Sequence, residues 1–149
     1  MKAMLLTSKN RRLSDMLQDQ IVHVLDHHQV GILTTLHENK PHSRLMTFSH
    51  EDLVLYSPIN RRTFSVEEIE KQETVHILLG YEWNGWENSY VEIEALAKVE
   101  ESEEIRERFW TDDLLAWIDE PKEHNYLLVQ FTPQSIRFFK DSKSKAQTF

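Results

Sequence analysis

The arginines are the side chains of this sequence best placed to recognise a specific ligand. Arg44 stands inside the segment 41–48 (PHSRLMTF), which reads as a strand entered from a proline turn. Arg61 and Arg62 lie just before a helix start at Ser65. A guanidinium can bind phosphate through two parallel hydrogen bonds, and helix N-terminal amides favour anions. The arrangement predicts a site for a phosphorylated ring compound.

Arg44 itself has two interpretations. The alternation of side chains along a strand gives one face with Arg44, Met46 and Phe48 and another with Ser43, Leu45 and Thr47. An arginine beside methionine and phenylalanine either faces a ligand at a barrel mouth or forms a salt bridge with one of the many carboxylates. The sequence alone leaves both open.

The basic loop also has two interpretations. Arg61, Arg62, the hydroxyl of Thr63 and the helix start at Ser65 could hold a phosphate. Ser65 with Glu68 fits a capping box, so the same residues also suit a solvated loop before an ordinary helix. The sequence contains neither a Gly-rich phosphate loop nor a Walker lysine, so it does not support nucleoside triphosphate binding.

Histidine and tryptophan are the other residue types to weigh. His23 and His27 are four apart on a predicted helix, but no Glu follows His23 as in the His-Glu-x-x-His pattern, so we expect surface histidines and no metal site. Trp110 and Trp117 are seven apart and could share one helix face. They would either pack in the core or stack on a flat ligand.

Length and composition restrict the class of protein. The chain has 149 residues, which fits a single domain (1–149) with its own core. A formal net charge of -8 argues against nucleic-acid binding, and the absence of cysteine excludes disulfides and thiolate chemistry. No apolar run is long enough for a membrane span or a signal peptide, so we expect a cytoplasmic protein with no membrane partner.

The elements that must position these residues are mostly strands. We expect an N-terminal arm over 1–12, a helix over 14–28 with Ser14 as its N-cap, and a frayed tail over 141–149. The predicted strands cover 30–36, 42–49, 53–57, 74–81, 90–99, 126–132 and 135–140, and shorter helices cover 66–72, 102–110 and 111–118. The first three strands should form an antiparallel meander, and the chain should leave the sheet between Pro58 and Thr63. This pattern predicts a mainly β fold, a small antiparallel barrel with peripheral helices.

The segments resemble, in their order, the pyridoxamine phosphate oxidase-like family of FMN-binding split barrels, and especially its bacterial general stress protein branch. The resemblance rests on GILTTL, PHSRLMTF, SVEEIE, YVEIEALA, the aromatic segment FW…AW and VQFTPQSIRFF, which together span residues 30–140. It implies a Greek-key antiparallel split barrel. It also implies a homodimer with FMN, or FAD, at the subunit interface.

The resemblance also assigns roles to individual residues. Arg44 would face the polar edge of the isoalloxazine, with Leu45, Met46 and Thr47 lining the ring. Ser57 would lie beside the ribityl phosphate chain, with the phosphate near Thr63 and Ser65. The aromatic segment with Trp110 and Trp117 would close over the flavin, in some relatives from the second subunit.

Two departures from the family pattern bear on function. Ser65 stands where relatives usually carry a phosphate-binding lysine, so either Arg61 or Arg62 supplies the charge or the affinity for FMN is low. Leu45 replaces a proline that usually follows the strand arginine. The C-terminal arginine–histidine pair of true pyridoxamine phosphate oxidases has no match, so we do not expect pyridoxal phosphate synthesis.

Three hypotheses follow for the function. The leading one is an FMN-dependent oxidoreductase of unknown substrate, with NADH or NADPH as a candidate electron donor. The second is a flavin-binding or stress-related protein without turnover. The third is a dimeric scaffold without a cofactor, which the serine at position 65 would permit.

Overall fold

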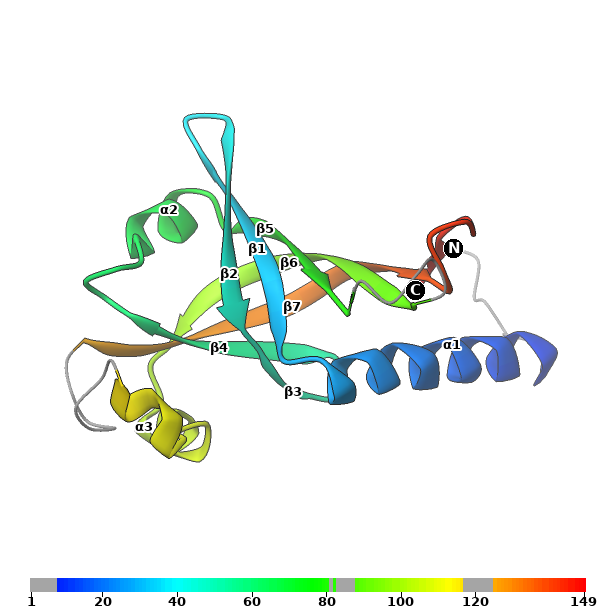
Figure 1. The fold of residues 1–149 in the computed structure, drawn as a ribbon, viewed down its shortest axis with the longest axis horizontal. Helices are drawn as coiled ribbons and strands as arrows, with labels where there is room; N and C mark the ends of the chain where they lie inside the picture. The colour runs from blue at the N-terminus through cyan, green and yellow to red at the C-terminus, as the bar shows by residue number, and fades with distance from the viewer. Residues whose placement is uncertain (1–7, 81, 83–87, 117–124) are drawn as a thin grey trace, which may run out of the picture.

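The protein is seen here in a computed structural model that describes residues 8–80, 82, 88–116 and 125–149 (Figure 1). Its strands are β1 Val30–His37, β2 Lys40–Thr47, β3 Ser49–Glu51, β4 Val54–Asn60, β5 Thr74–Leu79, β6 Tyr90–Glu100, β7 Tyr126–Phe139 and β8 Gln147–Thr148. Its helices are α1 Ser8–His27, α2 Val66–Lys71, α3 Glu103–Arg108 and the 3-10 helix η1 Asp112–Ala116.

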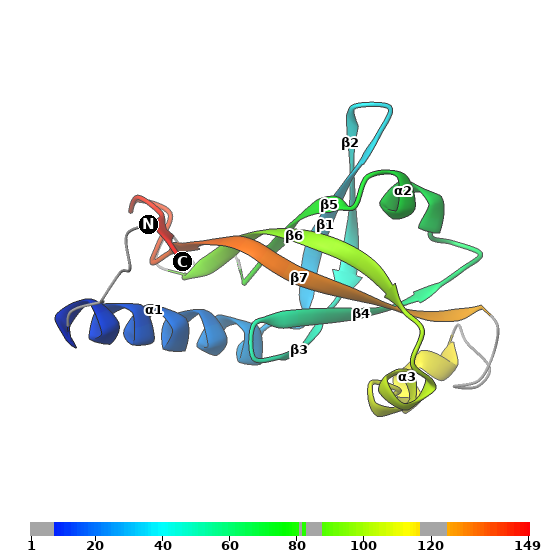
Figure 2. The ribbon, with the colours of Figure 1, turned by 180° about the vertical axis from the view of Figure 1, so that it is seen from behind.

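The strands form one antiparallel sheet in the order β2-β1-β5-β6-β7-β4-β3, with β8 added beside β7. The strands β5, β6 and β7 are a meander, and β4 returns to lie beside β7, which is a Greek-key arrangement. Seen from both sides, the sheet curls on itself and the helices lie at its margins (Figures 1 and 2). The predicted antiparallel split barrel with peripheral helices is therefore confirmed.

The core fills the inside of this curl. Side chains alternate between buried and accessible along the central strands, as in β5, where the buried residues are Val75, Ile77 and Leu79. Strands β6 and β7 and the end of α1 contribute further fully buried residues, including Ile93, Phe131 and Ile21. β5 ends at Leu79 because Gly80 turns the chain with φ +106°, a conformation that other residues rarely adopt.

The predicted three-stranded meander is wrong. β1 pairs with β2 and β3 pairs with β4, but β4 lies beside β7 and not beside β2. The predicted third strand, 53–57, is too short, because β4 continues to Asn60. The chain leaves the sheet after Asn60, within the predicted stretch from Pro58 to Thr63. β3 pairs with β4 only as far as Tyr56. On that side of β4 no neighbouring strand therefore requires a hydrogen bond from position 58, where proline has no backbone N–H.

The first helix is longer than predicted. α1 begins at Ser8, so Ser14 is not its N-cap, and Lys9, Arg11 and Arg12 lie in the helix rather than in an arm. Lysine, arginine and leucine are good helix formers, and nothing in this stretch stops a helix. The start of α1 projects beyond the sheet (Figures 1 and 2). Among the described residues no helix has the length and apolar character that a membrane span requires.

The end of the chain also differs from the prediction. β7 is one long strand that Pro133 does not divide. A β-bulge accommodates the proline, since Ala95 pairs with Pro133 while Glu94 pairs with Ser135. The tail is not frayed throughout. Its last residues form β8, and Phe149 exchanges two backbone hydrogen bonds with Ile136, of 2.8 and 3.2 Å.

Candidate functional site

A cleft of about 740 Å³ opens between β2, the end of β4, the loop that leads to α2, and the segment from α3 to η1. It is lined by Gln29, Val30, Arg44, Leu45, Met46, Thr47, Ser49, Pro58, Ile59, Asn60, Thr63, Phe64, Phe109, Thr111, Asp113 and Leu114. The lining combines apolar walls with a few polar groups, as in sites for small molecules. Of the predicted site residues, the cleft brings together Arg44, Leu45, Met46, Thr47 and Thr63.

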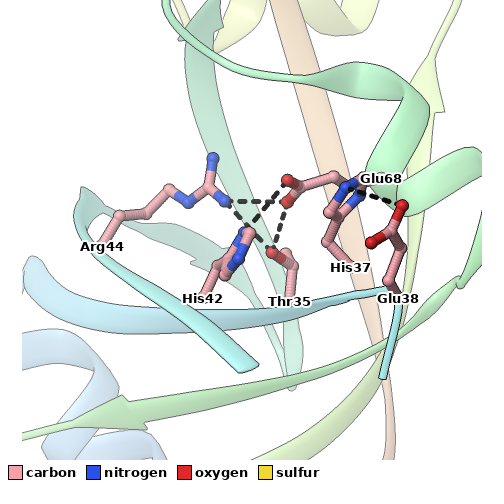
Figure 3. Close-up of polar contacts among 6 residues, drawn as sticks. All are labelled: Thr35, His37, Glu38, His42, Arg44 and Glu68. Atoms are coloured by element: carbon pink, nitrogen blue, oxygen red, sulfur yellow. Dashed lines mark hydrogen bonds and ion pairs between the residues drawn. The ribbon is translucent and has the colours of Figure 1, made fainter. Parts of the chain in front are cut away.

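Arg44 both forms a salt bridge and lines the cleft, so the two interpretations of this residue are compatible. Its Nη2 donates to Glu68 Oε2 at 3.0 Å and to Thr35 Oγ1 at 3.1 Å. The guanidinium carbon lies 4.7 Å from the centre of the Phe64 ring. Figure 3 shows that the other terminal nitrogen points away from Glu68. The salt bridge thus holds the guanidinium by one side only.

Glu68 of α2 is the centre of this polar cluster, and the predicted capping box is wrong. Ser65 is the N-cap by backbone geometry, but its side chain makes no capping hydrogen bond. The Glu68 carboxylate turns instead toward the sheet, where it accepts from Thr35 at 2.8 Å and from Arg44. A half-buried arginine and a buried hydroxyl on the sheet offer it stronger partners than the helix start does.

The surroundings of Glu68 favour its charged form. Its side chain is only 11% exposed. Burial alone would raise the pKa of Glu68, but hydrogen bonds from Thr35 and His42 and the charge and hydrogen bond of Arg44 together hold this pKa below its ordinary value. The carboxylate is therefore ionised at neutral pH and faces Arg44 as an anion.

His42 completes the cluster from the same strand as Arg44. Its Nδ1 lies 3.2 Å from Glu68 Oε1, and its side chain is 45% exposed. The His37 ring lies next to it, with 5.6 Å between the ring centres, and His37 Nε2 is 3.9 Å from a carboxylate oxygen of Glu38 (Figure 3). A titratable group thus contacts the carboxylate that neutralises Arg44.

The basic loop is organised by Asn60. The main-chain oxygen of Asn60 accepts from the backbone N–H of Thr63 and of Phe64, each at 3.0 Å, and its side chain accepts from the N–H of Arg62 at 2.9 Å. This turn places Thr63 in the cleft. The side chains of Arg61 and Arg62 are exposed beside it.

Ser57 and Ser65, like Arg61 and Arg62, do not line the cleft. Ser65 is exposed, outside the lining. Ser57 is completely buried, and its hydroxyl donates to the main-chain oxygen of Thr47 at 2.7 Å. A buried hydroxyl that already has a partner supports the wall of the site and is not available to a ligand.

The aromatic segment contributes a residue different from those predicted. Trp110 packs edge-on against Tyr126, with 5.3 Å between the ring centres, and belongs to a small cluster with Leu114. Its neighbour Phe109 lines the cleft and stacks on Tyr56 at 4.3 Å. The short helix α3 ends at Arg108, so the seven-residue helical spacing with Trp117 does not apply. Trp117 lies outside the described residues.

Several lining residues escaped the sequence reasoning. Phe64 directly follows Thr63, and its apolar side chain before a polar helix was a signal that it packs inward. Asn60 precedes the two arginines, and asparagine is a common turn residue. Phe109 had no distinguishing signal, because either aromatic residue of the pair could have faced the cleft. Among the described residues, no three potential metal ligands gather in one place.

The comparison with known protein families assigns the chain to one of them. A family model described as pyridoxamine 5'-phosphate oxidase matches residues 17–140, which include every strand from β1 to β7. The chain belongs to this pyridoxamine 5'-phosphate oxidase family. The resemblance inferred from the order of the sequence segments is therefore confirmed.

Individual relatives within this family include general stress proteins. The chain is 40% identical over 121 residues to General stress protein 26 of Bacillus subtilis strain 168, covering 81% of this chain and 86% of that protein. The structure of General Stress Protein 26 from Bacillus anthracis is similar with a TM-score of 0.78 and 32% identity, covering 89% of this chain and 97% of that one.

The same fold extends to a more distant protein. An FAD-binding protein from Mesorhizobium loti is similar with a TM-score of 0.64 and 13% identity, covering 78% of this chain and 87% of that one. At this identity the likeness shows the shared fold alone.

Proposed function

We propose that this chain binds FMN in the cleft beside β2 and works as an FMN-dependent oxidoreductase. The observation that carries the proposal is Arg44, which lines the cleft and is held by Glu68 through only one terminal nitrogen. Its remaining donors are available to the polar edge of a flavin ring. Membership of the pyridoxamine 5'-phosphate oxidase family supports the same assignment.

The residues of the cleft fit FMN. A volume of about 740 Å³ lies in the range of roughly 300–1,000 Å³ that is usual for small-molecule sites. Met46, Phe64 and Phe109 offer apolar surface to a flat ring. Leu45 and Thr47 of β2 complete the wall beside Arg44.

The phosphate would lie beside the turn organised by Asn60. Thr63 offers a hydroxyl there, and the exposed residues Arg61 and Arg62, which precede it in the chain, carry two positive charges. Ser65 lacks the charge that a lysine would bring, so these arginines are the candidate phosphate partners. The bound flavin would supply the redox chemistry, while the chain orients the ring and excludes water from it.

Other functions have weaker support. FAD is an alternative cofactor, because it carries the same isoalloxazine ring as FMN. A flavin-binding protein without turnover, or a scaffold without cofactor, would fit the uncharged residue at position 65.

For the oxidoreductase, NADH or NADPH is the proposed electron donor. The absence of cysteine fits a protein of the cytoplasm.

We also propose that the protein is a homodimer whose second copy covers the outer face of β2, β1 and β5. Leu45, Ile32 and Leu78 are cross-strand neighbours there, and their exposed fractions are 74%, 37% and 37%. Such a row of exposed aliphatic side chains is typical of an interface. Leu45 also lines the cleft, so a partner on this face would form part of the flavin site.

A visible spectrum tests the flavin assignment. Protein purified after overproduction, and incubated with excess FMN before gel filtration, should show flavin absorbance that co-elutes with it. Quenching of tryptophan fluorescence on titration with FMN gives the affinity independently. A colourless protein that shows no quenching would contradict flavin binding, and the scaffold without a cofactor would be the remaining hypothesis. Where flavin binds, bleaching by NADH or NADPH separates an oxidoreductase from a passive binder.

A further inference from the structure

The polar cluster behind the cleft is more extensive than a single salt bridge requires. Glu68 Oε2 accepts from Thr35 at 2.8 Å and from Arg44 at 3.0 Å, while Glu68 Oε1 lies 3.2 Å from His42 Nδ1. Thr35 is completely buried, and Glu68 is nearly so. Two strands and one helix thus converge on one carboxylate (Figure 3).

This arrangement fixes the direction of the arginine. Arg44 is held from one side by Glu68 and Thr35 and lies against the Phe64 ring at 4.7 Å. The hydrogen bonds that its guanidinium makes within the described part of the chain all use Nη2. A long side chain that is immobilised in advance loses less entropy when a ligand binds.

We propose that Glu68 is a positioning residue of the flavin site, an inference that rests on the proposed function. It holds Arg44 by Nη2, so that the other donors of the guanidinium face the ligand. It also offsets the arginine's charge. Glu68 thereby sets both the orientation and the effective charge of the group that meets the flavin.

A titration of the apoprotein with FMN at pH 8 tests this inference. Glu68→Ala should weaken binding by about tenfold, since it removes a charge-assisted hydrogen bond that orients Arg44. Glu68→Gln keeps an oxygen acceptor of the same shape, so at pH 8 it should remain within about threefold of the wild type. Glu70→Gln, on an exposed position of the same helix, is the matched control.

Thermal unfolding of each variant verifies that it is folded. If the wild type binds FMN but Glu68→Ala binds equally well, or Glu68→Gln binds as weakly as Glu68→Ala, the positioning role is wrong while flavin binding stands. If the wild type does not bind FMN, the proposed function itself fails and this inference fails with it.

Discussion

Ser57 on β4 donates a hydrogen bond of 2.7 Å to the main-chain oxygen of Thr47 on β2. These two strands are not neighbours, because β2 stands at one end of the sheet and β4 near the other. Thr47 and Pro58, the residue after Ser57, both line the cleft. One buried side-chain hydrogen bond therefore joins the two edges of the curled sheet underneath the candidate site.

Replacing Ser57 with alanine should destabilise the fold and loosen the cleft. A buried acceptor left without its partner costs roughly 1–3 kcal/mol, so urea unfolding should show a loss of that size. Ser89→Ala is the control, because the Ser89 hydroxyl makes a similar bond of 2.8 Å to Lys140 at an exposed position. That variant should change stability by less than about 0.5 kcal/mol. Equal losses in the two variants would contradict a special role for Ser57.

Arg44→Ala should weaken FMN binding. Hydrogen bonds to a charged group contribute about 1.5–3 kcal/mol, which corresponds to roughly a tenfold to hundredfold rise in the dissociation constant. Fluorescence titration gives this constant. Arg11→Ala, at an exposed position of α1, should bind as the wild type does. Unchanged affinity in a folded Arg44→Ala protein would place the flavin elsewhere.

The neighbours Phe109 and Trp110 should respond differently to truncation. Phe109→Ala removes a wall of the cleft, so FMN affinity should fall by about three- to tenfold, the value of one aromatic contact. Trp110→Ala removes a partly buried ring from the Tyr126 cluster and should lower the free energy of unfolding by about 2–3 kcal/mol. Paired binding and unfolding measurements distinguish the two effects. A larger loss of affinity in Trp110→Ala than in Phe109→Ala would reverse our assignment.

A charge introduced into the aliphatic row should prevent association. Leu45→Glu and Ile32→Glu place a carboxylate where we propose that the second copy packs, so each should elute as a monomer in gel filtration coupled to light scattering. Thr132→Glu adds the same charge at an exposed position of β7 and should leave the dimer intact. A wild type that is monomeric at all concentrations would contradict the interface.

Glu68 should contribute stability that disappears in acid. Its pKa in the folded protein lies below the ordinary value of 4.5, so the unfolded chain takes up the proton first as the pH falls. The contribution is therefore complete above about pH 5 and is lost as the pH falls through the lower, folded-state pKa. Urea unfolding of the wild type and Glu68→Gln should show a constant difference between pH 7 and 5, which shrinks below pH 4.5. A difference that persists unchanged to pH 3 would be inconsistent with the ionised cluster.

The outcome for Arg44 shows what sequence reasoning can predict. Alternation along a strand is a local property, so the shared face of Arg44, Met46 and Phe48 followed from their spacing, and the structure buries all three at least partly. The family order of the segments then predicted the barrel. The partner of Arg44 could only be called one of many carboxylates, because the choice of Glu68 depends on how α2 packs against β1.

The errors share this origin. Ser65 and Glu68 fit a capping box by spacing, yet tertiary contacts with Thr35 and Arg44 compete for the same carboxylate and prevail. Pro58 normally marks the end of a strand, and only the short reach of β3 makes it harmless here. These outcomes depend on neighbours far away in sequence.

The short strand β8 has a consequence for how the protein behaves in solution. β6 occupies one side of β7, and β4 covers the other side only from Tyr126 to Phe131. β8 pairs with Arg137 and Phe138 on the side that β4 leaves open. Unpaired strand edges recruit strands from other molecules and lead to aggregation. Removing residues 147–149 should therefore lower the solubility of the protein. The cleft should be unaffected, because it lies at the opposite end of β7.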